Sequence, residues 1–580
     1  MPKLLFLFII LWNFPVLAQQ ESSKVSPEDK AFNDFVMHTP IPIVTGKIIN
    51  CSPEFLEGRT INCQYILPYS PGIYDESIPV NKDGSFQIKS KYPIPYQQMI
   101  ISMHDYFFCQ LFVTKDLHFE IDMHQLSKDI SSFEGQGLRF SGTDGELCQY
   151  IHQCTWYSKK DKVNLKILTT QAKRNEQVAY QDFLKICIEN WKAHKRIDSA
   201  YIATHPSPYS WLINNCTQAY YLNELLQSPY YRMKTNDWLG TLHSSPIQEC
   251  IDYKGYCVSS DCILFYSSLT FYLFNQFTYQ HAPEFYKELL LLKALPDHLR
   301  QLLQQGIQLG ERYNQGDKKV YTAYYKIYKE LQTTLTEPLE KVYTPRFLSY
   351  LDSIFPPAKA DLLKMNLLLG DPEDKQNLIQ LLQPSLKTPW CLKILKDELI
   401  QVQKEIAQQQ QDLKIIQSGT TPLPPCQNVG KTDFGAHLYK VEKYKAKDFL
   451  TALQKNFPGK ALIIDFWSTW CGWCPSALQT SHEYKQALKD SPVEFIYICT
   501  SSSTTETKWQ TRVAQLKIPG IHIFLDTHIC QKILEQYALK EVYPTIIFIN
   551  KEGKYVPEAL SKNYLLDGAE KVKTRLQAYF

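Results

Sequence analysis

Three short, almost wholly apolar segments in the last quarter of the chain limit its fold more than any other feature. They read ALIIDFW from residue 461, VEFIYIC from residue 493 and PTIIFIN from residue 544. A strand that is apolar on both sides is buried on both faces of its sheet, with helices covering it. Helical stretches lie between the segments, and residues 568–580 are typical of a closing helix. The pattern predicts an α/β domain over residues 429–580.

The chain ahead of this domain has a different texture. Its total length of 580 residues is more than one hydrophobic core can hold, so several domains are expected. Short β-branched runs separated by Gly and Pro predict an all-β sandwich over residues 40–130, with Asp83-Gly84 as a hairpin turn. Apolar stripes at helical spacing predict an α-helical region over residues 140–417.

A proline-rich stretch separates the helical region from the α/β domain. It reads SGTTPLPPCQN, residues 418–428. Pro422, Pro424 and Pro425 disfavour a helix and favour an extended chain. We therefore predict a linker here.

The first 18 residues predict a cleaved secretory signal. Lys3 precedes an apolar run from Leu4 to Trp12, and small residues follow up to Ala18. Because a membrane span needs about 20 apolar residues, a short membrane anchor is the weaker alternative. We expect a periplasmic protein whose mature chain does not span the membrane. A net charge of +3 with 21% charged residues gives no indication of nucleic-acid binding.

Cys471 and Cys474 form the one CxxC pair of the chain, directly after the first apolar segment and at the start of a predicted helix. The first N–H groups of a helix lack partners within it and its dipole favours negative charge, so a thiolate at Cys471 is stabilised. We expect Cys471 to attack a disulfide and Cys474 to resolve the mixed disulfide. A zinc site is disfavoured because no further ligand pair follows at a suitable spacing. A structural disulfide or two inert cysteines are the remaining alternatives.

The chain has 16 cysteines, and those outside the CxxC pair are irregularly spaced. Cys148 with Cys154, and Cys257 with Cys262, are close enough in sequence to be candidate disulfides. Cys530 is considered as a third redox residue. Spacing alone does not decide which of these cysteines are paired.

The stretch DFWSTWCGWC, residues 465–474, resembles the thioredoxin superfamily. An acid, Phe-Trp, two small residues and Trp precede the CxxC, which is most similar to the extracytoplasmic thiol–disulfide oxidoreductases of the TlpA/ResA type. The order of domains also resembles multidomain members from Bacteroidota, which carry a β-sandwich and a helical region ahead of the thioredoxin domain. The motif resemblance covers residues 430–580, and ahead of them it rests on domain order alone.

The resemblance implies roles for residues outside the CxxC. The Tyr543-Pro544 bond is expected to be cis and to pack against the cysteines, and the backbone around it, with Thr545, is expected to bind substrate. Asp465 is expected to be buried in its strand and to take protons during the exchange. Burial would raise the pKa of such an acid toward neutral, as a general base requires.

The chain departs from the family pattern at two places. TlpA/ResA proteins commonly have a Glu three residues after the second cysteine, where this chain has Ala477. Gly472-Trp473 stands where Gly-Pro or Glu-Pro is more familiar. This dipeptide tunes the reduction potential, which spans about −270 to −120 mV in the family, so the direction of electron flow stays open. Trp473 and Trp470 are expected to form an apolar substrate-binding surface.

We therefore expect a multidomain, periplasmic thiol–disulfide oxidoreductase that reduces protein disulfides. Its redox group is the Cys471–Cys474 pair, with no cofactor and no metal. Protein thiols and disulfides are the expected substrates, and a membrane-bound electron donor is the expected partner. Two alternatives remain: a disulfide oxidase or isomerase with the same site, and a non-catalytic binding protein acting through its β-sandwich and helical region.

Overall fold

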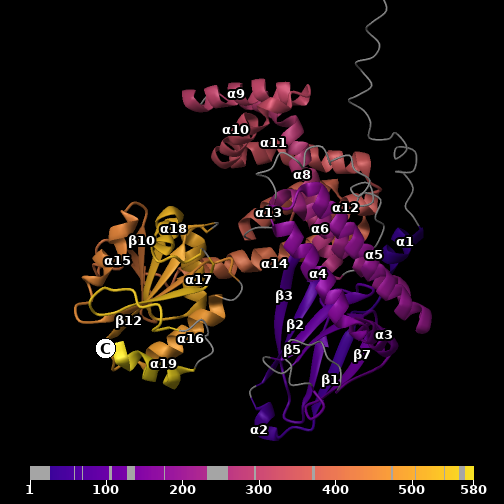
Figure 1. Ribbon diagram of the computed structural model, residues 1–580, viewed down its shortest axis with the longest axis horizontal. Helices are drawn as coiled ribbons and strands as arrows, with labels where there is room; N and C mark the ends of the chain where they lie inside the picture. Colours follow the sequence, from indigo (N-terminus) through magenta and orange to yellow (C-terminus); the bar gives the residue numbers. More distant parts are fainter. Residues whose placement is uncertain are drawn as a thin grey trace, which may run out of the picture. The chain divides into compact units, whose positions relative to one another are not determined.

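The computed structural model shows two compact units, Met1–Val402 and Gln403–Phe580. It describes residues 27–579 apart from 58, 68–69, 104–106, 127–136, 176, 232–258, 293–294, 369–371, 472–473, 503, 541 and 561–567. The predicted signal segment, residues 1–18, lies outside the described residues, as do Gly472 and Trp473. Figure 1 shows strands first, helices next and an α/β unit at the C-terminal end, which confirms the predicted multidomain layout.

The first part of the N-terminal unit is built from two four-stranded sheets, with strand orders β4-β1-β7-β8 and β3-β2-β5-β6. Buried residues alternate along the strands, as with Leu117, Phe119 and Ile121 of β7. The strands are β1 (Ile43–Ile49), β2 (Thr60–Leu67), β3 (Ser70–Pro79), β4 (Ser85–Lys89), β5 (Gln97–Met103), β6 (Phe107–Val113), β7 (Asp116–Asp122) and β8 (Leu138–Ser141).

The predicted hairpin at Asp83-Gly84 is wrong in one respect. A turn does form, because the Gly84 N–H donates to the Asn81 carbonyl oxygen at 2.9 Å and Gly84 has φ +83°. However, β3 and β4 on either side of the turn belong to different sheets, and β4 pairs with β1 instead. The turn signal specifies a reversal of the chain, whereas the packing of the strands decides which of them become neighbours.

Helices form the rest of this unit. They are α1 (Pro27–His38), α2 (Pro53–Leu56), α3 (Gly145–Trp156), α4 (Lys159–Arg174), α5 (Tyr180–Thr204), α6 (Ser210–Tyr231), α8 (Ser260–Leu289), α9 (Asp297–Asn314), α10 (Tyr321–Thr334), α11 (Thr336–Ile354), α12 (Pro357–Met365), α13 (Pro372–Leu382) and α14 (Pro389–Leu413). α14 runs past Val402, the last residue of the first unit, and its buried Ile394, Leu395 and Val402 have the helical spacing that predicts this region.

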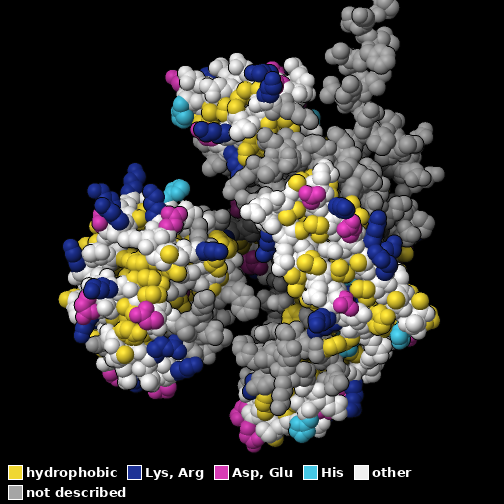
Figure 2. Space-filling view, viewed as in Figure 1, with side chains coloured by type: hydrophobic (Ala, Val, Ile, Leu, Met, Phe, Trp, Pro, Cys, Tyr) yellow, Lys and Arg dark blue, Asp and Glu magenta, His cyan; other side chains and the backbone are white. Residues whose placement is uncertain are grey.

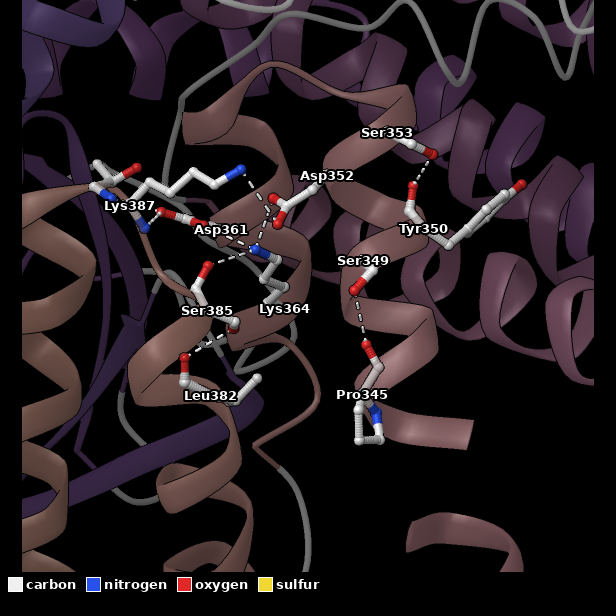
Figure 3. A network of polar contacts seen from close by, with 11 residues as sticks. Pro345, Ser349, Tyr350, Asp352, Ser353, Asp361, Lys364, Leu382, Ser385 and Lys387 are labelled. Atoms are coloured by element: carbon white, nitrogen blue, oxygen red, sulfur yellow. Dashed lines mark hydrogen bonds and ion pairs between the residues drawn. The ribbon is translucent and has the colours of Figure 1, made fainter. Parts of the chain in front are cut away.

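A buried polar network joins α11, α12 and the start of α14 (Figure 3). The Lys364 ammonium lies 2.7 Å from Asp352 and 3.4 Å from Asp361, and it donates to the Ser385 carbonyl oxygen at 2.8 Å. Asp361 also accepts from the backbone N–H of Thr388 at 2.6 Å. The two buried charged groups of this network, Lys364 and Asp361, therefore each have an ion-pair or hydrogen-bond partner within 3.4 Å.

Outside the CxxC, the described residues include twelve cysteines, nine of them buried and three half-buried. The proposed pairing of Cys148 with Cys154 is wrong. Both lie on α3, where six residues of helix separate them by about 9 Å along the axis, which is more than a disulfide can span. Cys257, of the other candidate pair, lies outside the described residues.

The C-terminal unit has a six-stranded sheet in the order β14-β11-β12-β13-β10-β9. The three apolar segments of the sequence form β11, β12 and β14, as predicted, and the fully buried β11 pairs parallel with β12 and antiparallel with β14. The strands are β9 (Gln427–Lys431), β10 (Ala436–Val441), β11 (Ala461–Trp467), β12 (Val493–Thr500), β13 (Gly520–Leu525) and β14 (Thr545–Ile549).

Helices cover both faces of this sheet (Figure 1). They are α15 (Ala446–Gln454), α16 (Cys474–Ala487), α17 (Glu506–Leu516), α18 (Thr527–Gln536) and α19 (Ala569–Leu576). One core cluster joins Ile463 of β11 to Leu478 of α16, and the other joins Ile464 of β11 to Leu450 and Ile533 on the opposite face. The alternation along β11 thus assigns each side chain to one of two cores.

The proline-rich stretch, residues 418–428, is attached to the C-terminal unit. Leu423 is buried in the core cluster on the α15 side of the sheet. Asn456 donates to the Pro424 carbonyl oxygen at 2.5 Å, and the Pro424–Pro425 bond is cis. The Tyr439 hydroxyl donates to the Thr421 carbonyl oxygen at 3.3 Å.

Candidate active site

The two cysteines of the CxxC lie between the end of β11 at Trp467 and the start of α16 at Cys474. Their sulfur atoms form a disulfide. Cys471 is 7% exposed and Cys474 is fully buried. The order of exposure fits the predicted roles, since an attacking sulfur must be reachable and a resolving sulfur need not be.

The start of α16 places a positive electrostatic environment at the sulfur of Cys471. The backbone N–H of Cys474 lies 3.1 Å from the Cys471 sulfur. This N–H belongs to the first turn of the helix, where backbone donors have no helical acceptor and the dipole is positive. The arrangement favours negative charge on the Cys471 sulfur once the disulfide is reduced.

The segment before β14 closes the other side of the pair. The Tyr543–Pro544 bond is cis, as the resemblance implied. The Tyr543 carbonyl oxygen lies 3.5 Å from the Cys471 sulfur. Thr545 begins β14 opposite Phe466 of β11, so pairing of these strands brings the segment to the CxxC.

An apolar rim formed by Trp470, Tyr543 and Val542 adjoins the largely buried Cys471. The Trp470 side chain is 53% exposed, yet its indole N–H donates to the Ser502 carbonyl oxygen at 2.8 Å, which fixes its orientation. The Trp470 and Tyr543 rings meet edge to face with centroids 5.8 Å apart. Val542, which is 61% exposed, adds to the same segment. The predicted contribution of Trp473 lies outside the described residues.

Asp465 lies in the middle of β11 and is 1% exposed. Neither of its carboxylate oxygens has a hydrogen-bond partner among the described residues. Burial raises its pKa to about 7, and the hydroxyl of Ser481 on α16 acts in the opposite direction. A carboxyl group with this pKa can take and return a proton near neutral pH.

The structure brings together more polar residues than the sequence indicated. His522 lies within β13 and is fully buried. Its ring stacks on Tyr497 of β12 with centroids 4.9 Å apart. Cys530 of α18 lies with its sulfur 3.5 Å from the Tyr543 hydroxyl oxygen, and burial is complete. In the sequence, the signal for this polar cluster is a histidine and a tyrosine inside otherwise apolar strand segments.

A cavity of about 600 Å³ lies elsewhere in this unit, between α15 and α18. Figure 2 shows Lys and Arg side chains gathered with a His over this end of the unit. The lining includes Lys445, Lys447, Lys532 and His528, but neither cysteine of the CxxC. No three His, Cys, Asp or Glu side chains of the described residues form a group that could hold a metal ion.

Comparisons with known proteins assign the domain. Residues 459–555 match the thioredoxin-like family. The thiol-disulfide oxidoreductase ResA of Bacillus thuringiensis (strain Al Hakam) is 27% identical over 125 residues, which cover 22% of this chain and 64% of the relative. ResA of Bacillus thuringiensis subsp. konkukian (strain 97-27) is 28% identical over 144 residues, covering 23% of this chain and 80% of the relative.

One solved structure, the thioredoxin domain of a thiol-disulfide oxidoreductase from Bacteroides vulgatus, is 25% identical with a TM-score of 0.18. That match covers 21% of this chain and 81% of the solved chain. The fold and the family match together define the C-terminal unit as a thioredoxin-like domain. Residues 459–555 therefore form a thioredoxin-like domain, which is similar in sequence to the ResA thiol-disulfide oxidoreductases. The predicted class of the domain is thereby confirmed.

Proposed function

We propose that this protein is an extracytoplasmic thiol–disulfide oxidoreductase that reduces disulfides in other proteins. The observation that carries the proposal is the Cys471–Cys474 disulfide, held at the first turn of α16 with Cys471 7% exposed and Cys474 fully buried. A disulfide that served structure alone would not need one slightly accessible sulfur next to a helix N-terminus.

The reaction begins from the reduced pair. The Cys471 thiolate attacks one sulfur of a substrate disulfide, forming a mixed disulfide and releasing the other substrate sulfur as a thiolate. Cys474 then loses its proton and attacks the Cys471 sulfur, which restores the enzyme disulfide and releases the second substrate thiolate. Two electrons pass from the enzyme to the substrate. A dithiol donor outside this chain must reduce Cys471–Cys474 again.

The surroundings divide the remaining tasks. The Tyr543 backbone, 3.5 Å from the Cys471 sulfur, and the rim of Trp470 are positioned to hold an extended substrate segment. Asp465 accepts the proton that Cys474 must lose, because its pKa of about 7 lets it serve as a base near neutral pH. Ala477 offers no acidic group for this task, which leaves it to Asp465.

We also propose export to the periplasm through the N-terminal segment, with a membrane-bound dithiol donor as the partner that resets the enzyme. The apolar run of Leu4 to Trp12 supports export. Within the described residues, no helix combines the length and apolar character that crossing a bilayer requires.

The two N-terminal sheets are assigned as the halves of a sandwich, since Tyr65 of β2 donates to the Lys89 carbonyl oxygen at the end of β4 at 3.1 Å.

Titration of the full chain in dithiothreitol and glutathione buffers tests the function, with trapping of free thiols as the readout. We expect one pair to titrate toward the reducing end of the family range, near −270 mV, and insulin disulfides to be reduced. Cys471→Ser should abolish both signals. Cys426→Ser, which removes a half-buried free thiol of the same unit, is the matched control and should leave both intact.

A midpoint near −120 mV would reverse the direction and make the protein a disulfide donor or isomerase. A pair that does not titrate would contradict the enzyme and favour the alternative of a binding protein.

A further inference from the structure

A row of polar side chains crosses the sheet beneath α16, inside a core that is otherwise apolar. Asp465 of β11 lies opposite Tyr497 of β12 in the parallel register, and Tyr497 lies opposite His522 of β13. Adjacent strands are about 4.8 Å apart and paired residues share a face, so the three side chains stand next to one another. All three are at most 1% exposed.

Each member of the row has a polar atom that the protein does not satisfy. Both Asp465 carboxylate oxygens, the Tyr497 hydroxyl and the His522 Nδ1 lack hydrogen-bond partners among the described residues. A buried polar atom without a partner is unfavourable, so its presence requires an explanation. Internal water, which takes two to four polar partners, typically joins otherwise unsatisfied buried polar atoms.

α16 faces this row with a second pair of polar side chains. Ser481 and Lys485 are four residues apart, so they share one side of the helix. The Ser481 hydroxyl is buried and also lacks a partner among the described residues. It lies close enough to Asp465 to influence the pKa of that carboxyl group.

Lys485 connects the row to the surface. Its side chain is 26% exposed and its ammonium lies 3.7 Å from Glu494, which is 19% exposed. A Cβ atom at Gly520 would stand 2.7 Å from the Lys485 ammonium and 3.4 Å from the Tyr497 ring. Because residue 520 is a glycine, there is space for the Lys485 ammonium near the ring of Tyr497, the middle member of the row.

His522 is fixed in the state that such a row needs. Its Nε2 donates to the Ile518 carbonyl oxygen at 2.8 Å, so Nε2 carries the proton and Nδ1 is an acceptor facing the core. Burial and the charge of Lys485 hold its pKa at about 4, which keeps the ring neutral. The charged groups that act on Tyr497 are Asp465 and Glu494.

We propose that Ser481, Tyr497 and His522 anchor an internal chain of water molecules that carries protons between Asp465 and the solvent at the Lys485–Glu494 pair. This inference rests on the proposed function, since it supplies the outlet for the proton that Asp465 takes from Cys474. Cys474–SH and the Asp465 carboxylate become a thiolate and a carboxylic acid. The acid then releases the same proton through the chain to bulk water. The proton needs this route to bulk water because a docked substrate would cover the alternative route past Cys471.

The experiment is a single-turnover measurement on the full chain, following release of substrate thiol in H₂O and in D₂O. Tyr497→Phe keeps the ring and its stacking on His522 but removes the anchoring hydroxyl. We expect the resolution step to slow by about three- to tenfold, less than the 10²–10⁴-fold of a group that transfers the proton itself. The solvent isotope effect should grow, and the reduction potential of the CxxC should not change. Tyr439→Phe removes a buried hydroxyl from the opposite face of the sheet and should change neither rate nor isotope effect.

Ser481→Ala provides a second variant on a different element, for use where Tyr497→Phe loses its fold. A variant that only loosens packing would lower the melting temperature without enlarging the isotope effect. Wild-type rates and isotope effects in both variants would overturn the proposal, and so would an isotope effect of one in the unaltered protein. If the unaltered protein reduces no disulfide, the proposed function fails first, and the two failures are thereby distinguished.

Discussion

Two aspartates, one in each unit, are buried to the same extent but have opposite surroundings. Asp361 in the N-terminal unit is fully buried, pairs with Lys364 at 3.4 Å and accepts backbone N–H groups of Lys387 and Thr388 at 2.7 and 2.6 Å (Figure 3). Asp465 in the C-terminal unit is 1% exposed and has no hydrogen-bond partner among the described residues. Burial alone therefore does not separate a structural carboxylate from a reactive one.

The difference between them lies in what the fold offers to the negative charge. Asp361 is surrounded by donors that stabilise its charge and tie α12 to the start of α14, so its contribution is to stability. Asp465 is buried with no hydrogen-bond partner among the described residues, so its charged form is disfavoured and its proton is held until about neutral pH. The first carboxylate fixes a structure, and the second is proposed to exchange a proton.

The largest effect is expected from removing the Lys364 ammonium, the cation that pairs with Asp361. Lys364→Met leaves the Asp361 charge buried without its ion pair, which we expect to destabilise the N-terminal unit by about 3–5 kcal/mol. Thermal unfolding followed by circular dichroism measures the effect. Lys387→Met, which removes a half-exposed ammonium 3.3 Å from Asp352, is the control and should cost under about 1 kcal/mol. Equal melting temperatures for the two variants would contradict the structural role.

The unsatisfied site should respond in its chemistry. Asp465→Asn cannot take a proton, so we expect turnover at about pH 7 to fall by roughly 10²-fold, equivalent to about 2.7 kcal/mol. In the unaltered protein the rate should rise with pH through about 7, because Asp465 acts as a base only when it is deprotonated. This rise should vanish in the variant. A rate–pH profile of Asp465→Asn with the same rise would show that another group is the base.

The two sites should also differ in how pH affects stability. The pKa of Asp465 is about 7 in the folded chain against an ordinary 3.8, so the folded state keeps a proton that the unfolded state has released. Stability from this group is therefore complete below pH 3.8 and is lost as pH rises through about 7. We expect a loss of about 2 kcal/mol from the C-terminal unit between about pH 5 and pH 8.

Melting temperatures across this range measure that loss. The fall should be shallower in Asp465→Asn, while Asp448→Asn, at an exposed position of the same unit, should keep it. If the melting temperature falls equally with pH in the unaltered protein, Asp465→Asn and Asp448→Asn, Asp465 is not the source of the loss of stability.

The smallest effect is expected at the outer edge of the satisfied network. Asp352 lies 2.7 Å from the Lys364 ammonium but is 23% exposed. Asp352→Asn should cost about 1 kcal/mol or less, because Asp361 and the Ser385 carbonyl oxygen still hold the cation. Chemical denaturation of the variant beside Lys364→Met measures the difference. A loss as large as that of Lys364→Met would move the centre of the network from Asp361 to Asp352.

Much of the C-terminal unit was predictable because its signals are local. Continuous apolar runs specify strands buried on both faces, and β11, β12 and β14 are where those runs predict them. The position of the CxxC between β11 and α16 follows from the same reading. The Asp83-Gly84 turn shows the limit of such signals, since the sequence specifies the reversal but not which sheet each strand joins.

The row of Asp465, Tyr497 and His522 was not predictable because only the pairing register of three strands makes these residues neighbours. Tyr497 and His522 are isolated polar residues in two separate apolar segments, and neither has a motif. Only the pairing of β11 with β12 and of β12 with β13 places them beside Asp465. Likewise, the sequence gives no spacing that relates Gly520 to Lys485, which meet because α16 lies over the end of β13.

The many cysteines have a consequence for how the chain must mature. Nine of the twelve cysteines that the described residues include outside the CxxC are buried, and they share a chain with a disulfide whose proposed chemistry is exchange. While the polypeptide is unfolded, the thiolate of any of these cysteines can attack the Cys471–Cys474 disulfide, and the cysteines can also be oxidised by an oxidant of the compartment. Folding and oxidation are then in competition during biogenesis. A chain that folds first hides its thiols, whereas one that is oxidised first is trapped with the wrong bridges.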